Sequence, residues 1–389
     1  MTHSRFLPSL VLCLTPSLVF GAGYYLPNQD ALATAKGNAF VATADSPAAV
    51  FYNPAGLTQV QTPQAEIGVY SIVLGNKADI GGRSYKADTE LQAAPHIYYA
   101  RPLSEDWSLG IGVNSPFGLG TEWGQDTPFR QAVTEARLMY VSATAALGYR
   151  VNEQLSIGAS VSGNYADLTL EQGIGPTAPG YLRYEGNDVG VSGSIGVLWQ
   201  PTPQHAFGLN YSTKSEFDLE GDVRSNLLPD SHGDMDFITP ARVAFGYSFR
   251  PKPGWNIEAN IEWLDWDSLN TLKLKSASVG GETPVPFEWK SCFIYELGVS
   301  YTTPEGWIFA AGYDFNESAQ PDQYFNPGVS DANRHWLNAG FGRRYENQSW
   351  FLAYQFGFSD RTVNDSVIGT NGDYKARHNA LLLSYTRQF

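Results

Sequence analysis

The amino-acid sequence predicts an all-β protein, a 14-stranded antiparallel transmembrane β-barrel with an N-terminal hatch that plugs the lumen. The first observation is composition, because only 16% of the 389 residues are charged, while 14% are aromatic and 39 residues are glycine. Soluble proteins carry about 25% charged residues, whereas outer-membrane barrels combine an apolar outer band with girdles of aromatic side chains. The second observation is residue alternation along many segments, and the third is a strict alternation of short and long connections.

Charge and hydropathy exclude two other classes of protein. The formal net charge is −14, which argues against nucleic-acid binding because that function requires clustered Lys and Arg. The mean hydropathy is −0.25, and no run of about 18 apolar residues follows residue 21. A bundle of membrane-spanning helices is therefore excluded.

The N-terminus predicts export of the chain. Residues 1–21 are expected to be a signal peptide, because Arg5 precedes an apolar stretch and small residues then allow cleavage after Gly21 or Ala22. Cys13 lies inside this segment, so its removal leaves Cys292 alone and no intrachain disulfide can form. The closed hydrogen-bond ladder of a barrel would stabilise such a chain instead.

Residues 22–58 are predicted to form the hatch. They are rich in Ala, Gly, Asn and Pro and show no clean period before the first strand, expected at about 64–75. A leader of about 37 residues is long for a simple tail, and a 14-stranded barrel is wide enough for an open channel unless it is plugged. The alternative is a disordered periplasmic tail, against which stand the apolar residues Phe40, Val41, Val50, Phe51 and Tyr52.

Alternation with a period of two residues predicts the strands. In 155–162 aliphatic residues alternate with small and polar ones, and in 255–263 Trp, Ile and Ala alternate with Asn and Glu. Segments 206–212, 307–314 and 350–358 show the same pattern, with aromatic residues toward strand ends as in interfacial girdles. A soluble β-sandwich is the alternative, but its apolar face would point inward.

The connections set the strand count of the barrel, which is assigned to residues 59–389. Six connections are short and turn-like, at 102–106, 150–154, 201–204, 251–254, 303–306 and 345–348. Seven are longer and polar, at about 76–89, 117–132, 171–185, 220–235, 270–286, 316–333 and 359–376. These alternate strictly and join fourteen strands, an even number with short periplasmic turns, as in bacterial outer-membrane barrels.

A set of ordered motifs runs along nearly the whole mature chain. The N-terminal part contains Ala22-Gly23-Tyr24-Tyr25 and then Phe51-Tyr52-Asn53-Pro54-Ala55-Gly56-Leu57. Further motifs follow at 82–88, 115–123, 155–158, 289–301 and 318–337. Together they resemble the FadL/TodX (OMPP1) family of outer-membrane channels for hydrophobic compounds, whose hatch carries an Asn-Pro-Ala motif.

The resemblance implies passive uptake of long-chain fatty acids across the outer membrane of a Gram-negative bacterium, with aromatic or aliphatic hydrocarbons as the alternative cargo. The ligand would pass to an inner pocket above the hatch and leave sideways, through a gap made by a kinked third strand, into the outer leaflet. Expected partners are hydrophobic small molecules, outer-membrane lipid and the barrel assembly machinery, with no nucleic acid. A monomer is expected because a closed barrel has no sheet edge to pair.

The hatch turn is assigned to Asn53, Pro54, Ala55 and Gly56. Asn bonds its own backbone in turns and Pro fixes φ, so this motif suits a tight, rigid turn. The alternative is an ordinary turn without a role in transport.

The lateral-gate strand is assigned to Pro116, Phe117 and Gly118. Proline cannot donate to a strand ladder and glycine tolerates a bulge, so pairing should fail there and the wall could open. The alternative is that these residues merely end a strand at its loop.

Two residues are predicted to contact the ligand. By its position before Leu297-Gly298, Lys290 resembles a basic residue that contacts the ligand carboxylate in fatty-acid channels, although a loop-base lysine would look the same in sequence. Tyr24 resembles the family's near-terminal aromatic residue, which reaches into the pocket; its alternative is a packing role within the hatch. Asp167 stands where fatty-acid members can have an arginine, and an acid there would favour a neutral hydrocarbon as the ligand.

No catalytic residue, cofactor or metal site is predicted. The sequence has no Gly-x-Ser-x-Gly motif, and its six histidines are not paired at metal-ligand spacing. An outer-membrane lipid hydrolase is kept as an alternative, because barrel enzymes can carry scattered Ser and His residues. A general diffusion porin would need an open lumen, which the hatch argues against.

Overall fold

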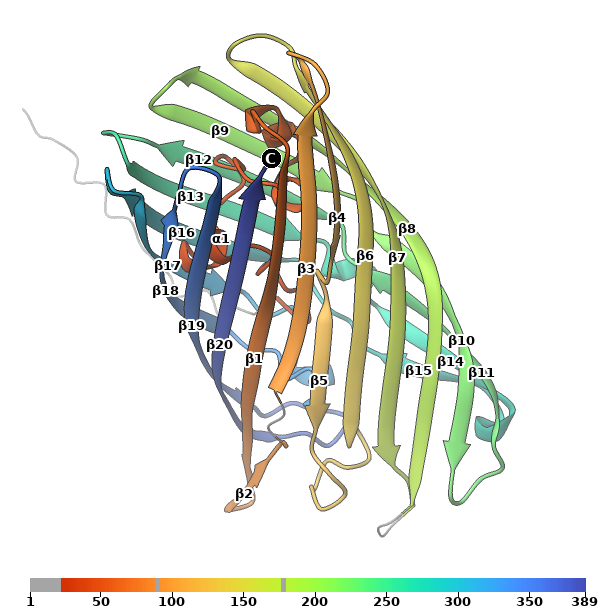
Figure 1. Cartoon of the computed structure of the whole chain (residues 1–389). Coiled ribbons are helices and arrows are strands. Elements are labelled where there is room, and N and C mark those ends of the chain that lie inside the picture. Colours follow the sequence, from red (N-terminus) through yellow and green to blue (C-terminus); the bar gives the residue numbers. More distant parts are fainter. Residues whose placement is uncertain (1–21, 89–90, 176–179) are drawn as a thin grey trace, which may run out of the picture.

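The chain folds into one closed β-barrel (Figure 1). The computed structural model describes residues 22–88, 91–175 and 180–389. The expected signal peptide at residues 1–21 lies outside these described residues. The chain ends at the end of the barrel that carries the short turns, and the N-terminal segment, red in Figure 1, lies among the strands toward that end.

Within the described ranges, twenty strand segments form one sheet that makes fourteen wall strands. Nine wall strands are single segments: β1 (Gln64–Ile80), β3 (Leu91–Pro102), β6 (Glu135–Arg150), β7 (Leu155–Gly173), β8 (Tyr181–Thr202), β17 (Trp307–Asn316), β18 (Arg334–Arg344), β19 (Gln348–Val363) and β20 (Gly372–Gln388). Five are interrupted, and each consists of two segments: β4 (Trp107–Asn114) with β5 (Gly118–Glu122), β9 (His205–Ser212) with β10 (Ser215–Ser225), β11 (Ser231–Thr239) with β12 (Arg242–Phe249), β13 (Trp255–Leu264) with β14 (Thr271–Ser276), and β15 (Gly281–Pro286) with β16 (Cys292–Thr302). β2 (Arg83–Lys86) pairs with the far end of β1. The predicted fourteen strands are confirmed.

Pairing between the first and last wall strands closes the barrel. β1 pairs with β20 from Gln64↔Gln388 to Asp79↔Asp373, and its other neighbour is β3. All these ladders are antiparallel. A closed ladder leaves no open sheet edge at membrane depth, which is the condition for β-structure to span lipid.

Side chains alternate between an apolar outer face and an inner face that holds small and polar residues. On β20, Leu381, Leu383 and Tyr385 are exposed, whereas Leu382 and Ser384 between them are buried. The apolar face of the strands therefore points away from the lumen, toward the lipid. The β-sandwich alternative is wrong, because its apolar face would point inward.

The six predicted short turns are confirmed, but the long connections contain more strand than expected. The predicted loop 171–185 includes the end of β7 and the start of β8, and the predicted loop 270–286 is a hairpin of β14 and β15 joined by the 3-10 helix η3 (Ala277–Val279). The period-two signal requires one apolar face, which lipid imposes only at membrane depth. In these parts the outer face is polar and the apolar residues face inward, as Leu272 and Leu274 do in β14, so the apolar outer face that marks a membrane-spanning strand is missing.

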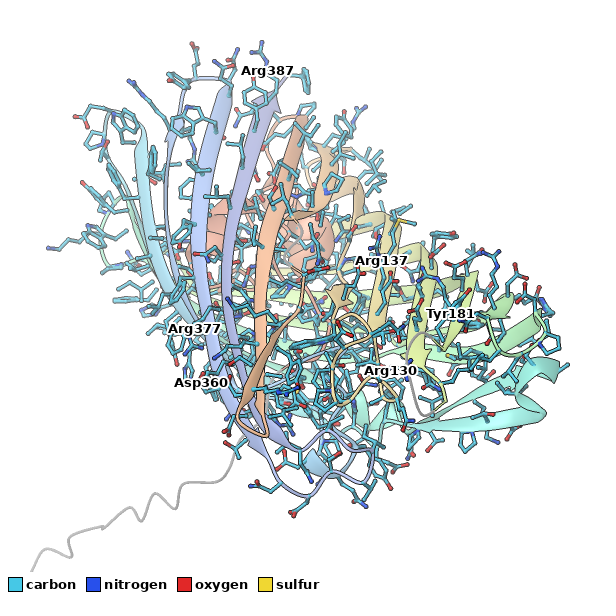
Figure 2. The ribbon with its side chains drawn as sticks, turned by 90° about the horizontal axis from the view of Figure 1, so that it is seen from below. Arg130, Arg137, Tyr181, Asp360, Arg377 and Arg387 are labelled. Atoms are coloured by element: carbon cyan, nitrogen blue, oxygen red, sulfur yellow. The ribbon has the colours of Figure 1, made fainter. Side chains whose placement is uncertain are left out.

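Charged side chains stand at both ends of the β19–β20 wall (Figure 2). Arg387 lies at the short-turn end, whereas Arg377 and Asp360 lie toward the opposite end and form an ion pair of 3.0 Å. The apolar outer residues Leu381 and Leu383 lie between them in sequence. This order matches an apolar band with a polar region on each side.

Residues 22–60 pack between wall strands. They contain α1 (Ala31–Ala35), α2 (Ala49–Tyr52) and the 3-10 helix η1 (Pro54–Gln59), and most of their side chains are buried. α1 contacts β17 to β20, while η1 contacts β3, β4 and β6 to β8. Two further 3-10 helices, η2 (Trp266–Ser268) and η4 (Asp322–Tyr324), lie in the longer connections. None of the helices in the described residues is long and apolar enough to cross a membrane.

One buried carboxylate ties this segment to the wall. Oε1 of Glu258 on β13 accepts hydrogen bonds from the backbone N–H groups of Ala42 (2.8 Å) and Thr43 (3.3 Å). Its Oε2 pairs with Nζ of Lys36 at 3.2 Å and accepts a hydrogen bond from the Thr43 hydroxyl. Both charged side chains are almost fully buried. The glutamates that alternate with apolar residues in 255–263 therefore face inward, and Glu258 is one of them.

Replacing Glu258 by alanine is expected to loosen residues 36–43 from the wall. The change leaves Lys36 buried without its partner, and breaking such a pair costs about 3–5 kcal/mol. The amides of Ala42 and Thr43 should then exchange with deuterium roughly 10-fold faster or more, as measured by exchange mass spectrometry in detergent. Glu216→Ala is the control, because Glu216 pairs with Lys214 on the exposed surface. Unchanged protection in Glu258→Ala would contradict the anchoring role.

Candidate functional site

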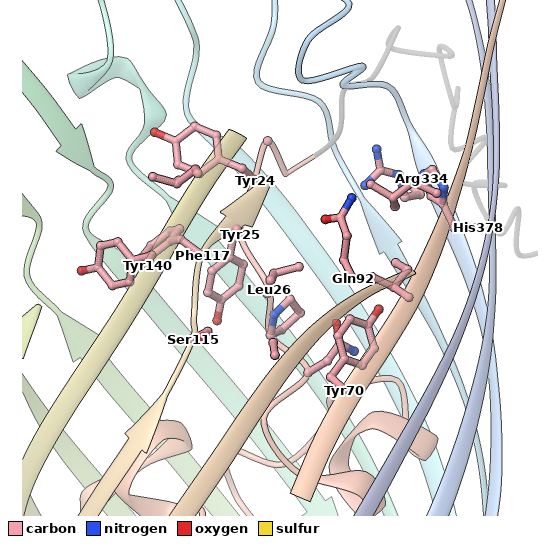
Figure 3. A pocket seen from close by; sticks show the side chains of 18 of the residues that line it. Tyr24, Tyr25, Leu26, Tyr70, Gln92, Ser115, Phe117, Tyr140, Arg334 and His378 are labelled. Carbon is pink, nitrogen blue, oxygen red and sulfur yellow. The ribbon is translucent and has the colours of Figure 1, made fainter. Parts of the chain in front are cut away.

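A cavity of about 250 Å³ lies between the N-terminal segment and the wall (Figure 3). Residues 23–28 line one side of it, and the inner faces of β1, β3, β5, β6 and β17 to β20 contribute most of the rest. Most of its side chains are aromatic or aliphatic, including Tyr24, Tyr70, Ile72, Leu74, Phe117, Leu138, Tyr140 and Trp336. An apolar cavity with a few polar groups is the usual form of a small-molecule site.

Tyr24 packs in an aromatic cluster on one side of this cavity. Its ring centroid lies 4.7 Å from that of Trp266, 5.6 Å from that of Trp289 and 6.1 Å from that of Phe117. Burial raises the pKa of Tyr24, so the phenol stays protonated and donates to the carbonyl of Ile238 at 3.3 Å. Tyr24 thus lines the cavity and packs against residues of the barrel outside its own segment. Its contact with a ligand stays a prediction.

The N-terminal segment pairs with the third wall strand where that strand is interrupted. The backbone N–H of Leu26 donates to the carbonyl of Pro116 at 2.9 Å, and that of Gly118 donates to the carbonyl of Tyr24 at 3.0 Å. Phe117 between them is buried against the cluster of Tyr24. The predicted break at 116–118 is therefore present, and its backbone groups bond to the N-terminal segment. Its use as an exit stays a prediction.

The interruption leaves two neighbouring strand edges without a shared ladder. Leu91 to His96 of β3 lack partners on that side, because the ladder between β3 and β4 begins only at Ile97↔Val113. β5 pairs with β6 on its other side. Among the described residues no ladder joins β3 to β5. The hydrogen bond from the N–H of Asp88 to the carbonyl of Glu122, 2.8 Å long, bounds this gap on the long-loop side.

A half-buried cation also lines the cavity. Arg334, the first residue of β18, lies beside His378 in Figure 3. Its Nη2 donates to the carbonyl of Ser330 at 3.4 Å, whereas its Nε has no hydrogen-bond partner and no carboxylate forms an ion pair with it among the described residues. The guanidinium therefore retains donor capacity for an acceptor in the cavity.

Sequence reasoning missed Arg334 as a site residue, although it named the motif that contains it. Arg334 shares the even-numbered register of Trp336 and Asn338, which are buried. This alternation along the strand was the sequence feature that could have predicted an inward-facing guanidinium. An arginine at the start of a strand is usually taken as a loop-base residue, so the signal was easy to overlook.

The predicted hatch turn packs on the wall rather than on the cavity. Asn53 donates from Nδ2 to the carbonyls of Val41 (2.9 Å) and Val197 (3.1 Å), and its Oδ1 accepts from the N–H of Ala55 at 3.2 Å. Asn53 thus caps η1 and fastens it to β8. A side chain at Gly56 would collide with the carbonyl of Ala44. Asn53, Pro54, Ala55 and Gly56 form a tight buried turn, and none of them lines the cavity.

Lys290 and Asp167 both lie away from the cavity. The side chain of Lys290 is exposed, whereas that of the preceding residue, Trp289, is buried against Tyr24. Lys290 does not line the cavity, and its contact with a ligand carboxylate stays a prediction. Asp167 has the outward register of β7, between the buried residues Ala166 and Leu168, so it does not oppose a carboxylate inside the barrel.

Comparisons with known proteins agree on one family. The model of outer membrane transport proteins (OMPP1/FadL/TodX) matches residues 12–388. The long-chain fatty acid transport protein of Salmonella typhi is 25% identical over 350 residues, which cover 77% of this chain and 78% of the relative. A FadL homologue of Pseudomonas aeruginosa superposes with a TM-score of 0.83 at 17% identity, covering 95% of this chain and all of that one. The toluene transporter TodX of Pseudomonas putida has a TM-score of 0.75 at 19% identity, covering 96% and 100% of the two chains. These structures share the fold.

Replacing Tyr24 by alanine is expected to loosen the contact between the N-terminal segment and the interrupted strand. Truncating a buried aromatic side chain typically costs about 3–5 kcal/mol, and here the loss falls on the cluster that holds Phe117. The amides of Leu26 and Gly118 should exchange faster, as measured by exchange mass spectrometry. Tyr354→Ala is the control, because Tyr354 faces outward on β19. Equal exchange in Tyr24→Ala and wild type would show that the backbone bonds alone hold the strand.

Proposed function

Because the chain belongs to the OMPP1/FadL/TodX family of outer membrane transport proteins, it transports hydrophobic compounds in the outer membrane of a Gram-negative bacterium, and we propose that its cargo is long-chain fatty acid. The cavity is the observation that carries this proposal. It offers an apolar and aromatic lining to an alkyl chain and the guanidinium of Arg334 to a carboxylate. The relative from Salmonella typhi is named a long-chain fatty acid transport protein, which supports the same class of cargo.

The two parts of a fatty acid match the two parts of the cavity energetically. Burying an alkyl chain stabilises the complex by about 0.8 kcal/mol for each methylene group. A charge-assisted hydrogen bond to the carboxylate adds about 1.5–3 kcal/mol. Arg334 is half-buried and forms no ion pair among the described residues, although Asp331 and Asp314 attract its charge from a longer distance. A bound carboxylate would therefore give the guanidinium an ion-pair partner.

A hydrocarbon is the second candidate cargo. Toluene would use the aromatic lining but leave Arg334 without an acceptor. An acid at position 167 would favour a hydrocarbon only if it faced the lumen, where it would repel a carboxylate. Asp167 has the outward register of β7, so it does not favour a hydrocarbon. Fatty acid is therefore the better match to the cavity.

The proposed route enters from the long-loop end and leaves sideways into the outer leaflet. Residues 22–58 act as a hatch that closes the barrel toward the short turns, held there by Glu258 and Asn53. The exit is the gap between β3 and β5, next to Pro116, Phe117 and Gly118. Lys290, exposed near the aromatic cluster, serves as an outer contact that attracts carboxylates to a protein of net negative charge.

The protein is proposed to act as a monomer without enzymatic activity. The closed ladder offers no sheet edge for a second copy. Outer-membrane lipid and the barrel assembly machinery are its expected partners in the membrane. A lipid hydrolase, the alternative of another class, would need an activated serine.

Calorimetric titration with oleate and with toluene distinguishes the two kinds of cargo and identifies the residue that holds the carboxylate. We expect Arg334→Gln to weaken oleate binding by about 1–3 kcal/mol and to leave toluene binding nearly unchanged, which also shows that the variant is folded. Lys290→Ala is the matched control, with near wild-type affinity for both. Weaker oleate binding in Lys290→Ala instead would move the carboxylate to Lys290. Binding of toluene without oleate would make the protein a hydrocarbon channel.

A serine-reactive probe tests the hydrolase alternative. Incubation of the purified protein with a fluorophosphonate is expected to label no residue, and a lipase assay with a long-chain ester should give no product. Stoichiometric labelling of one serine, detected by mass spectrometry, would overturn the assignment as a channel without enzymatic activity.

A further inference from the structure

A second cavity of about 200 Å³ lies at the gap between β3 and β5. Leu91 and Arg137, which line it, are exposed on the outer side of the wall, and Figure 2 labels Arg137. The main cavity lies on the inner side of the same gap. Among the described lining residues, Gln92 and Thr121 are the two that belong to both cavities. These two side chains therefore stand between the lumen and the outer wall.

The amide of Gln92 crosses the gap. Its Nε2 donates to the backbone carbonyl of Gly120 on β5 at 2.6 Å, where a strand ladder would otherwise join the two edges. Gly120 allows this close approach, because a Cβ at that position would lie 2.6 Å from the same nitrogen. The hydroxyl of Thr121 is buried without a partner in the described residues. Between the Asp88–Glu122 bond and the ladder at Ile97, the Gln92 amide supplies the hydrogen bond that joins β3 to β5 among the residues that the structure describes.

A side chain is a different kind of closure from a backbone ladder. A ladder bond breaks only when the strands separate, whereas the Gln92 amide can leave Gly120 by rotating about its own side-chain bonds. The neighbouring strands keep their other pairings, since β3 stays paired with β1 and β5 with β6. Rotation of the Gln92 side chain therefore leaves both of these ladders intact.

We propose that the Gln92 side chain is the latch of the sideways exit, closed when its amide bonds to Gly120 and open when it rotates away and joins the two cavities. The inference rests on the proposed sideways exit. Gln92 acts as a positioning and gating residue and holds no part of the cargo. A glutamine suits this place, because a carboxylate would be repelled by the Gly120 carbonyl and an apolar side chain would offer no donor to it.

The test compares variants that keep the size of the side chain and remove the bond. Gln92→Leu lacks the donor, and Gln92→Glu presents oxygens to the Gly120 carbonyl. Gln348→Leu is the matched control, because Gln348 bonds to Tyr385 at the short-turn end of β19. The initial rate of radiolabelled oleate uptake is measured in Gram-negative cells that lack their own channel, normalised to the amount of folded barrel on a heat-modifiability gel.

Both Gln92 variants are expected to take up oleate about two- to tenfold faster than wild type, the factor for the loss of one hydrogen bond. Gln348→Leu should match wild type. Uptake by wild type, combined with equal or slower uptake in both Gln92 variants, would overturn the latch and leave the proposed transport intact. Absence of oleate and toluene uptake in wild type would refute the proposed function itself. Calorimetry with oleate shows that each variant still binds the cargo.

Discussion

The rest of the structure depends on the requirement that backbone groups at membrane depth be hydrogen-bonded within the protein. Lipid offers no donors or acceptors, so a wall strand can break only where something else satisfies its N–H and C=O groups. At the break in the third wall strand, the N-terminal segment satisfies these groups. The N–H of Leu26 bonds to the carbonyl of Pro116, and the N–H of Gly118 bonds to the carbonyl of Tyr24. The same few residues thus stabilise the break in the wall and form one side of the cavity. A shift of Tyr24 would alter the cavity and the gap together, which would couple the proposed binding site to the proposed exit.

Two buried ion pairs inside the barrel differ from Arg334 in how their charges are satisfied. Glu258 pairs with Lys36, and Glu262 pairs with Arg242 at 3.2 Å, while Nη1 of Arg242 also donates to the hydroxyl of Tyr25 at 2.8 Å. These pairs join the wall to the N-terminal segment, and each charge has its partner within the protein. Arg334 differs, because no carboxylate lies within ion-pair distance of it among the described residues. Asp331 and Asp314 attract its charge from a longer distance, and the donors that remain at the cavity suit the external acceptor that we propose.

The sequence predicted the barrel well because lipid imposes the period-two pattern that makes strands visible, as in 255–263 and 350–358. It also located the break at 116–118, since proline and glycine act on the backbone directly and need no tertiary information. The residues of the candidate site were harder to predict from the sequence. Lys290 lies in the connection between β15 and β16, where alternation along a strand cannot predict which way a side chain points. For Arg334 and Asp167, by contrast, alternation with Trp336 and Ala166 along the strand did indicate the direction of the side chain. Gln92 carried no local signal, because its proposed role arises from a hydrogen bond to the backbone carbonyl of a residue 28 positions away in the sequence.

The strength of the closure suits transport that consumes no energy. For the proposed fatty-acid cargo, each methylene group gains about 0.8 kcal/mol on leaving water for an apolar phase, whether that phase is the cavity or the lipid leaflet. Transfer from the cavity to the leaflet therefore costs little. The protein therefore has to lower a barrier and has no need to drive the step. A gap closed by a ladder of several backbone bonds would open rarely, and an open gap would expose unpaired backbone to lipid. One side-chain hydrogen bond, with a net value of about 0.5–1.5 kcal/mol, lies between these limits. In the proposed mechanism, thermal motion is enough to break this bond, and the Gln92 amide donates to the Gly120 carbonyl again once the cargo has passed.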